Sequence, residues 1–180
     1  TWQGGGGWGD PLQRDPALVA KLQAVAGRVP VLSGVAESSC LEACRYVKDC
    51  EKLGADGFML MPPMIYKTPD TRESLAHFRT VAKATGLPIM IYNNPVDYKI
   101  DVTIEMFADL VSVPNIQAVK ESTRDVTNVT RMRNAFGDRF KILCGVDTLA
   151  LEELLLGADG WVAGLVCAFP AETVAVFRLA

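Results

Sequence analysis

Lys120 is the residue whose type and position point most directly to chemistry. It ends an otherwise apolar run, Ile116-Gln117-Ala118-Val119-Lys120. A lysine among apolar neighbours loses hydration of its ammonium group, which favours the neutral amine. A neutral amine can attack a carbonyl carbon and form a Schiff base. Lys120 is therefore a candidate nucleophile; the alternative is a lysine that extends from a strand end into solvent.

Tyr92 is the second candidate, because it ends the apolar run before that of Lys120. Neighbouring parallel strands would bring the two side chains close together. A phenol can carry a proton to or from a reacting group; the alternative is an aromatic ring that only packs. Gly145 and Gly164 end later apolar runs, where the absence of a side chain would let a ligand approach the backbone.

The elements that position these residues are six short, nearly continuous apolar runs. Such runs are typical of strands buried on both faces of a parallel sheet. Amphipathic helices are expected between them, for example one with Leu75, Phe78 and Ala82 on its apolar face. The runs cover residues 29–35, 57–62, 87–92, 116–120, 140–145 and 161–166.

The repeat of these units predicts an α/β fold of the (β/α)₈-barrel type. Gly54-Ala55-Asp56-Gly57 precedes one run and Gly157-Ala158-Asp159-Gly160 precedes another. A doubly wound open sheet is the alternative. About six of eight units are visible, so we expect a partial barrel domain over residues 29–180. Residues 1–28 are expected to form an atypical start, with a Gly-rich run, Gly4 to Gly7, and a helix from about Pro16 to Ala26.

Three motifs together resemble the dihydrodipicolinate synthase / N-acetylneuraminate lyase family. They are Tyr92-Asn93-Asn94-Pro95, Val119-Lys120-Glu121-Ser122 and Cys144-Gly145-Val146-Asp147. The resemblance runs from about residue 28 to residue 180. It implies a (β/α)₈ lyase that acts on a small 2-oxo acid or cyclic imino acid through a lysine Schiff base. It also implies a homo-oligomer, usually a tetramer, that needs no metal and no organic cofactor.

The resemblance assigns roles to individual residues. Lys120 matches the Schiff-base lysine and Tyr92 the proton-relaying tyrosine. Tyr66 matches, more loosely, a tyrosine that reaches a neighbouring subunit's site. The expected substrate-binding positions are Gly145, Val162, Asn94, Gly7 and Trp8.

Two departures from the family pattern bear on the substrate. Gly7 and Trp8 stand where the family has two threonines that help to hold the 2-oxo acid carboxylate. Asp97 stands where dihydrodipicolinate synthases have a carboxylate-binding arginine, and a carboxylate cannot do that task. The motifs therefore favour a dehydratase or deaminase of small hydroxylated acids, such as 1-pyrroline-4-hydroxy-2-carboxylate deaminase. An aldolase of 2-oxo-3-deoxy sugar acids is the alternative.

Composition narrows the partners. The chain of 180 residues has a formal net charge of −3 and no strongly basic stretch, which argues against nucleic acid and anionic membranes. No apolar run approaches the roughly 18 residues of a membrane-spanning helix, and no signal peptide is visible. The five cysteines form no C-x-x-C pair, which favours free thiols in the cytoplasm. His77, the single histidine, is expected on the surface, so no metal site is predicted.

Two other readings stay open. The chain could be a catalytically dead, truncated barrel, or a phosphate-binding barrel that uses Gly160 to Gly164 as a loop. Both ends look incomplete. Six strands alone would leave two open sheet edges, so we expect the isolated chain to aggregate and to lack activity.

Overall fold

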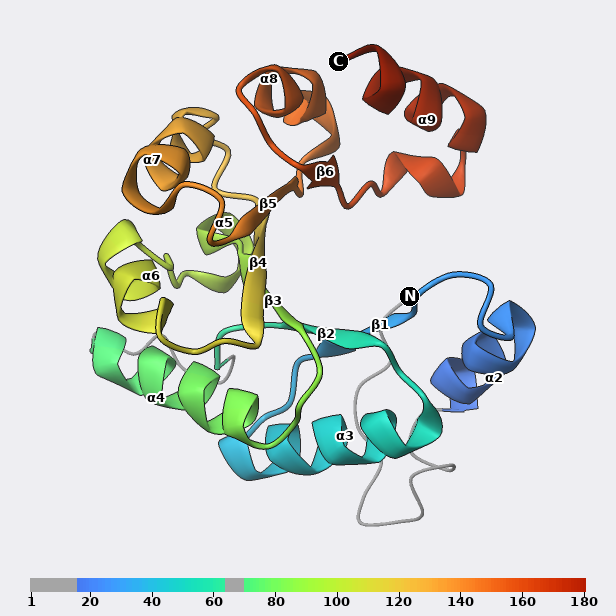
Figure 1. Cartoon of the computed structure of the whole chain (residues 1–180), viewed down its shortest axis with the longest axis vertical. Helices are drawn as coiled ribbons and strands as arrows, with labels where there is room; N and C mark the ends of the chain where they lie inside the picture. The colour runs from blue at the N-terminus through green and yellow to red at the C-terminus, as the bar shows by residue number, and fades with distance from the viewer. Residues whose placement is uncertain (1–15, 64–69) are drawn as a thin grey trace. The chain divides into compact units, whose positions relative to one another are not determined.

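Short strands and helices alternate along the chain in the computed structural model, which describes residues 16–63 and 70–180 (Figure 1). The strands are β1 (Leu32–Val35), β2 (Gly57–Leu60), β3 (Ile89–Asn93), β4 (Ile116–Glu121), β5 (Lys141–Cys144) and β6 (Gly160–Trp161). The α-helices are α2 (Pro16–Val25), α3 (Cys40–Leu53), α4 (Thr71–Lys83), α5 (Pro95–Tyr98), α6 (Ile104–Leu110), α7 (Thr127–Phe136), α8 (Ala150–Leu155) and α9 (Pro170–Leu179). Two 3₁₀ helices are η1 (Asp147–Leu149) and η2 (Leu165–Cys167).

The order of the strands decides between the two predicted architectures. The sheet runs β1-β2-β3-β4-β5-β6, the same as the order in the chain. The pairs β1–β2, β4–β5 and β5–β6 are parallel. Sequential parallel order belongs to the (β/α)₈ barrel, whereas a doubly wound sheet reverses its order partway. The described residues therefore form six strands of an incomplete (β/α)₈ barrel, as predicted. In the described part of the chain, no helix is long and apolar enough to cross a membrane.

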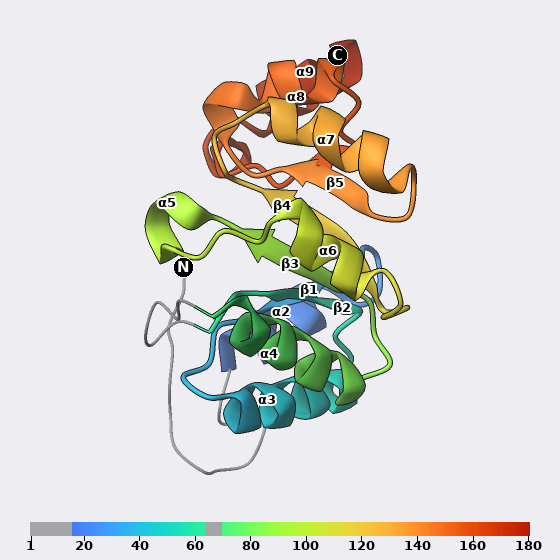
Figure 2. The ribbon, with the colours of Figure 1, turned by 90° about the vertical axis from the view of Figure 1, so that its left-hand side faces the viewer.

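The described residues form two compact units. The first comprises residues up to Met90 together with Val113–Ile116. In it, α3 and α4 pack against each other beside β1 and β2 (Figures 1 and 2). Its core contains the fully buried side chains of Val47, Phe58, Phe78 and Val81.

His77, in this first unit, is not the surface residue that the sequence suggested. It lies on α4 with only 7% of its surface exposed, and its ring meets Phe78 edge-on at 5.9 Å between centroids. Burial lowers the pKa of His77, while a hydrogen bond with the backbone of Met61 opposes this shift. His77 therefore serves as a core residue of α4.

The second unit comprises Ile91–Ser112 and Gln117–Ala180. Its core includes Val119 of β4, Ile142 of β5 and a pair of rings, Phe107 and Phe140, that meet edge-on at 5.3 Å. The predicted catalytic residues Tyr92 and Lys120 both belong to this unit.

The repeated Gly-Ala-Asp-Gly sequence makes the same bonds in each unit. The Asp56 carboxylate accepts from the Val31 N–H at 2.8 Å, and the Asp56 N–H donates to the Val31 carbonyl at 2.9 Å. Asp159 bonds Ile142 in the same way, at 2.8 and 2.7 Å. Each aspartate thus ties the start of one strand to the start of the preceding strand, as the register of a parallel pair requires.

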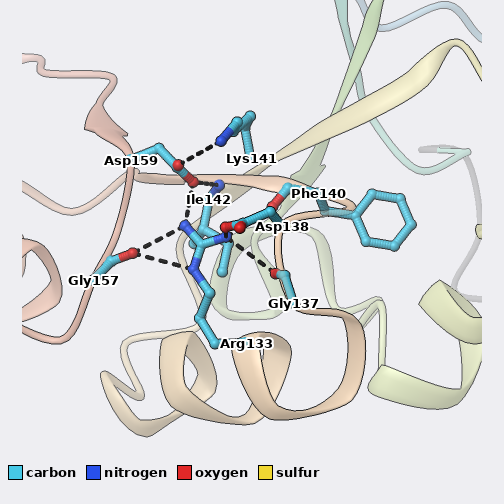
Figure 3. Close-up of polar contacts among 8 residues, drawn as sticks. All are labelled: Arg133, Gly137, Asp138, Phe140, Lys141, Ile142, Gly157 and Asp159. Atoms are coloured by element: carbon cyan, nitrogen blue, oxygen red, sulfur yellow. Dashed lines mark hydrogen bonds and ion pairs between the residues drawn. The ribbon is translucent and has the colours of Figure 1, made fainter.

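Arg133 of α7 extends this bonding in the second unit (Figure 3). Its guanidinium pairs with Asp159 and donates to the Gly157 carbonyl at 3.0 Å. It also donates to the carbonyls of Gly137 and Phe140 at 3.2 and 3.3 Å. One side chain therefore joins the loop before β5 to the loop before β6, at the end of the strands opposite to Lys120.

The sixth strand is shorter than predicted. The sequence suggested a strand over residues 161–166, but β6 ends at Trp161 and Leu165–Cys167 forms η2. The Asp147 carboxylate accepts from the N–H groups of Gly164 and Leu165 at 3.0 and 2.9 Å, and from the Trp161 indole at 3.1 Å. These bonds turn the backbone away from the extended conformation of a strand.

Candidate active site

Lys120 and Tyr92 lie together at the ends of β4 and β3. The Lys120 Nζ atom sits over the Tyr92 ring, 4.1 Å from its centroid. Both side chains are half-buried. An ammonium at this distance from an aromatic face is attracted by the ring quadrupole. The structure thus brings the predicted nucleophile and the predicted proton relay into direct contact.

Gly145 provides the space in which Lys120 lies. A Cβ atom at residue 145 would be 2.9 Å from Lys120 Cε and 2.0 Å from Ser122 Oγ. It would also be 2.9 Å from the Glu121 carbonyl oxygen, which accepts the Gly145 N–H at 2.7 Å. Any side chain at this residue would overlap atoms of β4. The role of Gly145 in the structure is therefore to let β5 approach the lysine.

The two asparagines that follow Tyr92 have different hydrogen-bond partners. Asn93 is fully buried and bonds the backbone of Val102 twice: Nδ2 donates to the carbonyl at 3.1 Å and Oδ1 accepts the N–H at 3.0 Å. Asn94 faces the site instead. Its Nδ2 atom donates to the Tyr92 hydroxyl at 3.1 Å and to the Asp97 carboxylate at 2.7 Å. Asn94 therefore bonds the Tyr92 hydroxyl directly, a contact that the sequence did not indicate.

Two further residues belong to the site although they were not predicted. The Tyr98 ring packs edge-on against Tyr92 with centroids 5.5 Å apart, and burial is the main cause that raises the pKa of Tyr98. Ser122 is 3% exposed, and its hydroxyl has no hydrogen-bond partner among the described residues. Strand alternation gave a signal for Ser122, because residues two apart share one face of a strand.

The remaining predicted positions are placed as follows. Val162 follows β6 and is half-buried, and its N–H donates to the Cys144 carbonyl at 2.8 Å. Tyr66, Gly7 and Trp8 lie outside the described residues.

Two carboxyl groups of the second unit, those of Glu121 and Glu153, are buried. Glu121 of β4 accepts from the Thr123 N–H and the Asn128 amide, each at 2.7 Å, yet burial still raises its pKa. Glu153 of α8 is fully buried, and neither of its oxygens has a hydrogen-bond partner among the described residues. Burial, together with the charge of Glu121, raises the pKa of Glu153 to about 7.

The thiol of Cys144 is buried near the Glu153 carboxyl group. It lies close enough to Glu153 to lower the pKa of that carboxyl slightly, but it donates to the Val146 carbonyl at 3.3 Å. Burial raises the pKa of Cys144 to about 12, so the thiol stays protonated. Among the described residues, no hydrogen bond joins Lys120 to the Cys144 thiol or to the Glu153 carboxyl group.

The site combines an amine and a phenol, which lie in contact where Gly145 packs against the end of β4. An amine that loses its proton can attack a carbonyl, and a phenol next to it can carry the protons that such an addition moves. These are groups that Schiff-base chemistry can use.

Comparisons with known proteins identify the family of this chain. The model of the dihydrodipicolinate synthetase family matches residues 14–180. A 4-hydroxy-tetrahydrodipicolinate synthase of Exiguobacterium sibiricum is 36% identical over 159 residues, which are 88% of this chain and 54% of that protein. The chain thus spans about half the length of the curated relatives that it matches.

Solved structures give the same result. The 4-hydroxy-tetrahydrodipicolinate synthase of Methylacidiphilum fumariolicum SolV superposes with a TM-score of 0.87 at 31% identity, over 94% of this chain and 55% of that one. The chloride-inhibited dihydrodipicolinate synthase of Acinetobacter baumannii, complexed with pyruvate, also has a TM-score of 0.87, at 27% identity over 94% and 58% of the two chains.

The packing at Gly145 predicts that Gly145→Ala is poorly tolerated. The added methyl group must displace Ser122, Lys120 or backbone, so we expect the free energy of unfolding to fall by about 1–3 kcal/mol. Urea unfolding measures the change. Gly86→Ala is the matched control, because a Cβ at the exposed Gly86 meets only Glu51 Oε1, at 3.9 Å. Equal effects of the two substitutions would contradict this account of Gly145.

The raised pKa of Glu153 should make the free energy of unfolding depend on pH. Its pKa in the folded protein, about 7, exceeds the ordinary value of 4.5. The folded state therefore holds its proton more tightly, and stability falls as pH rises from 4.5 to 7. Glu153→Gln removes this loss, so the variant should match the parent near pH 4.5 and be more stable at pH 8, by up to about 3 kcal/mol.

Unfolding by urea across this pH range tests the prediction for Glu153. Glu73→Gln, at an exposed residue of α4 that is not among the groups acting on Glu153, is the control and should keep the pH dependence of the parent. The same slope in Glu153→Gln and in the parent would show that Glu153 does not hold a proton in the folded protein.

Proposed function

Because the chain belongs to the dihydrodipicolinate synthetase family, we propose that it carries the active site of a Schiff-base lyase for a small 2-oxo acid or cyclic imino acid. Lys120 is the nucleophile. The observation that carries this proposal is the contact between the Lys120 amine and the Tyr92 ring, 4.1 Å apart at neighbouring strand ends. The A. baumannii relative that is complexed with pyruvate supports a 2-oxo acid as the ligand.

In the proposed first step, the neutral Lys120 amine adds to the carbonyl carbon of the 2-oxo acid. A C–N bond forms, the carbonyl π bond opens, and the amine passes one proton to the oxygen, which gives a carbinolamine. The hydroxyl group then leaves as water, taking a proton from the Tyr92 phenol, and the nitrogen lone pair forms the iminium ion. Tyr92 regains its proton from solvent. General acid catalysis of this kind contributes about 10²–10⁴-fold.

Asp97 narrows the choice of substrate within the proposed class of 2-oxo acids and cyclic imino acids. Its carboxylate accepts the amide of Asn94 at 2.7 Å, and a carboxylate at this position repels the substrate carboxylate that an arginine would bind. We therefore favour dehydration or deamination of a hydroxylated acid, such as deamination of 1-pyrroline-4-hydroxy-2-carboxylate. The names of the relatives favour a second candidate, the synthesis of 4-hydroxy-tetrahydrodipicolinate.

Three further features of the whole protein are proposals as well. Tyr66 contributes to the site of a neighbouring subunit in a homo-oligomer. The lack of hydroxyl groups at Gly7 and Trp8 weakens binding of the substrate carboxylate. The protein works in the cytoplasm without a metal or organic cofactor.

Borohydride reduction in the presence of pyruvate tests the nucleophile in the protein that carries this chain. We expect a stable adduct of reduced pyruvate on Lys120, identified by peptide mass spectrometry, because reduction traps the iminium ion. Lys120→Arg should abolish the adduct, since a guanidinium does not form the imine. An adduct on Lys99 or Lys141 in place of Lys120 would refute the assignment.

Product analysis tests the substrate. We expect ammonia release from 1-pyrroline-4-hydroxy-2-carboxylate and negligible condensation of pyruvate with aspartate semialdehyde, because Asp97 offers no cation to the second carboxylate. A 2-oxo-3-deoxy sugar acid serves as the third substrate in the comparison. Efficient condensation with aspartate semialdehyde would establish the second candidate instead.

A further inference from the structure

The hydrogen bonds of Asn94 fix the direction of the bond to Tyr92. The Asn94 Oδ1 atom accepts the Asp97 N–H at 3.2 Å, and one Nδ2 hydrogen goes to the Asp97 carboxylate at 2.7 Å. A backbone N–H can only donate and an ionised carboxylate can only accept. Rotating the amide by half a turn would put donor against donor and acceptor against acceptor. Asp97 therefore holds the Asn94 amide in a single orientation.

This orientation determines what the Tyr92 hydroxyl can do. The second Nδ2 hydrogen of Asn94 points to the Tyr92 oxygen, 3.1 Å away. The phenol oxygen must accept this bond, so its own proton is free to be donated elsewhere. Tyr98 holds the ring from one side, edge-on at 5.5 Å, and Lys120 Nζ lies over its face.

We propose that Asn94, oriented by Asp97, is a positioning residue that keeps the Tyr92 hydroxyl poised as a proton donor to the group attached at Lys120. The proposal rests on the proposed Schiff-base function. It gives Asn94 a task different from direct substrate binding. It also gives Asp97 a role. The Asp97 carboxylate cannot bind an anionic substrate, but it holds the Asn94 amide in place.

The step affected is the loss of water from the carbinolamine. The C–O bond breaks, the hydroxyl group takes the phenol proton and leaves as water, and the iminium ion forms on Lys120. If the phenol proton were donated to residue 94, it would be withheld from this leaving group. A residue at position 94 that accepts instead of donating should therefore slow formation of the iminium ion without weakening the binding of the 2-oxo acid.

The competing explanation is that Asn94 only begins helix α5, since its side chain is the N-cap and accepts the Asp97 N–H. Aspartate and serine serve as N-caps about as well as asparagine. Asn94→Asp and Asn94→Ser therefore keep the cap and remove only the donor to Tyr92. In Asn94→Asp, the new carboxylate accepts the Tyr92 proton, whereas the serine side chain is too short to reach the phenol as the amide does.

The experiment measures the rate of iminium formation with pyruvate, by quenching with borohydride at successive times and determining the adduct on Lys120 by mass. It uses the protein that carries this chain, over a range of pyruvate concentrations. At neutral pH we expect both variants to lose at least about 10-fold in the limiting rate, within the range of general acid catalysis. The pyruvate concentration that gives half the limiting rate should change less than about 2-fold. The substitutions remove an interaction that acts in the transition state for loss of water and not in the binding of pyruvate.

The dependence on pH separates positioning from a structural role. Below its pKa, the carboxyl group introduced by Asn94→Asp can donate to the phenol, so the rate of this variant relative to the parent should rise as pH falls from about 8 to about 5. The charged or titratable groups near this carboxyl are Asp97, Tyr92, Tyr98 and Lys120. Asn94→Ser has no such group, and its relative rate should stay low throughout. Asn134→Asp, the same change at an exposed residue of α7, is the control.

Each outcome decides between the explanations. Rates like the parent in Asn94→Asp and Asn94→Ser overturn the positioning role while leaving the Schiff base intact. Slow rates in both variants without recovery at low pH assign Asn94 to structure alone and also overturn it. Absence of any Lys120 adduct in the unmodified protein overturns the proposed function, and the positioning role with it. Thermal unfolding of each variant shows whether the fold is retained.

Discussion

The absence of a side chain at residue 145 is the constraint on which the site depends. Because Gly145 has no Cβ, its backbone can donate to the Glu121 carbonyl at 2.7 Å while Ser122 Oγ and Lys120 Cε fill the space beside it. Close approach of β5 confines the lysine stem on one side. On the other side the amine meets the Tyr92 ring. A flexible side chain with four rotatable bonds is thereby restricted to one region, which is what preorganisation of a nucleophile requires.

The strand starts supply the register that makes this packing possible. Asp56 and Asp159, in the two copies of Gly-Ala-Asp-Gly, each bond both backbone groups of a residue at the start of the preceding strand. A shift of one residue would break these bonds and turn inward-facing side chains outward. The bonds that fix stability therefore lie at one end of the strands, and the groups that can react lie at the other. This separation lets the site vary without loss of the fold.

The sequence predicted those features that depend on local pattern. Apolar runs indicated the strands, and the ends of two runs indicated Lys120 and Tyr92. The sixth strand was predicted, but β6 is shorter than the apolar run suggested, because the turn after Trp161 is made by Asp147, a residue outside that run. His77 was also placed wrongly, since its burial comes from packing between elements. The bond from Asn94 to Tyr92 could not be predicted either, because nothing in a sequence gives the rotamer of an asparagine or the orientation of its amide.

Under the proposed function, the carboxylate of Asp97 alters the active site beyond the loss of one substrate contact. An arginine there would carry donors only, and it could not accept the Nδ2 hydrogen that Asn94 gives to Asp97. The carboxylate accepts that hydrogen and leaves the other for the Tyr92 oxygen. Under the proposed function, substrate specificity and proton transfer are therefore coupled through the side chain of Asp97 in α5. Changing residue 97 to recruit a second carboxylate would also release the amide that orients Tyr92, so the two properties cannot be changed independently at this position.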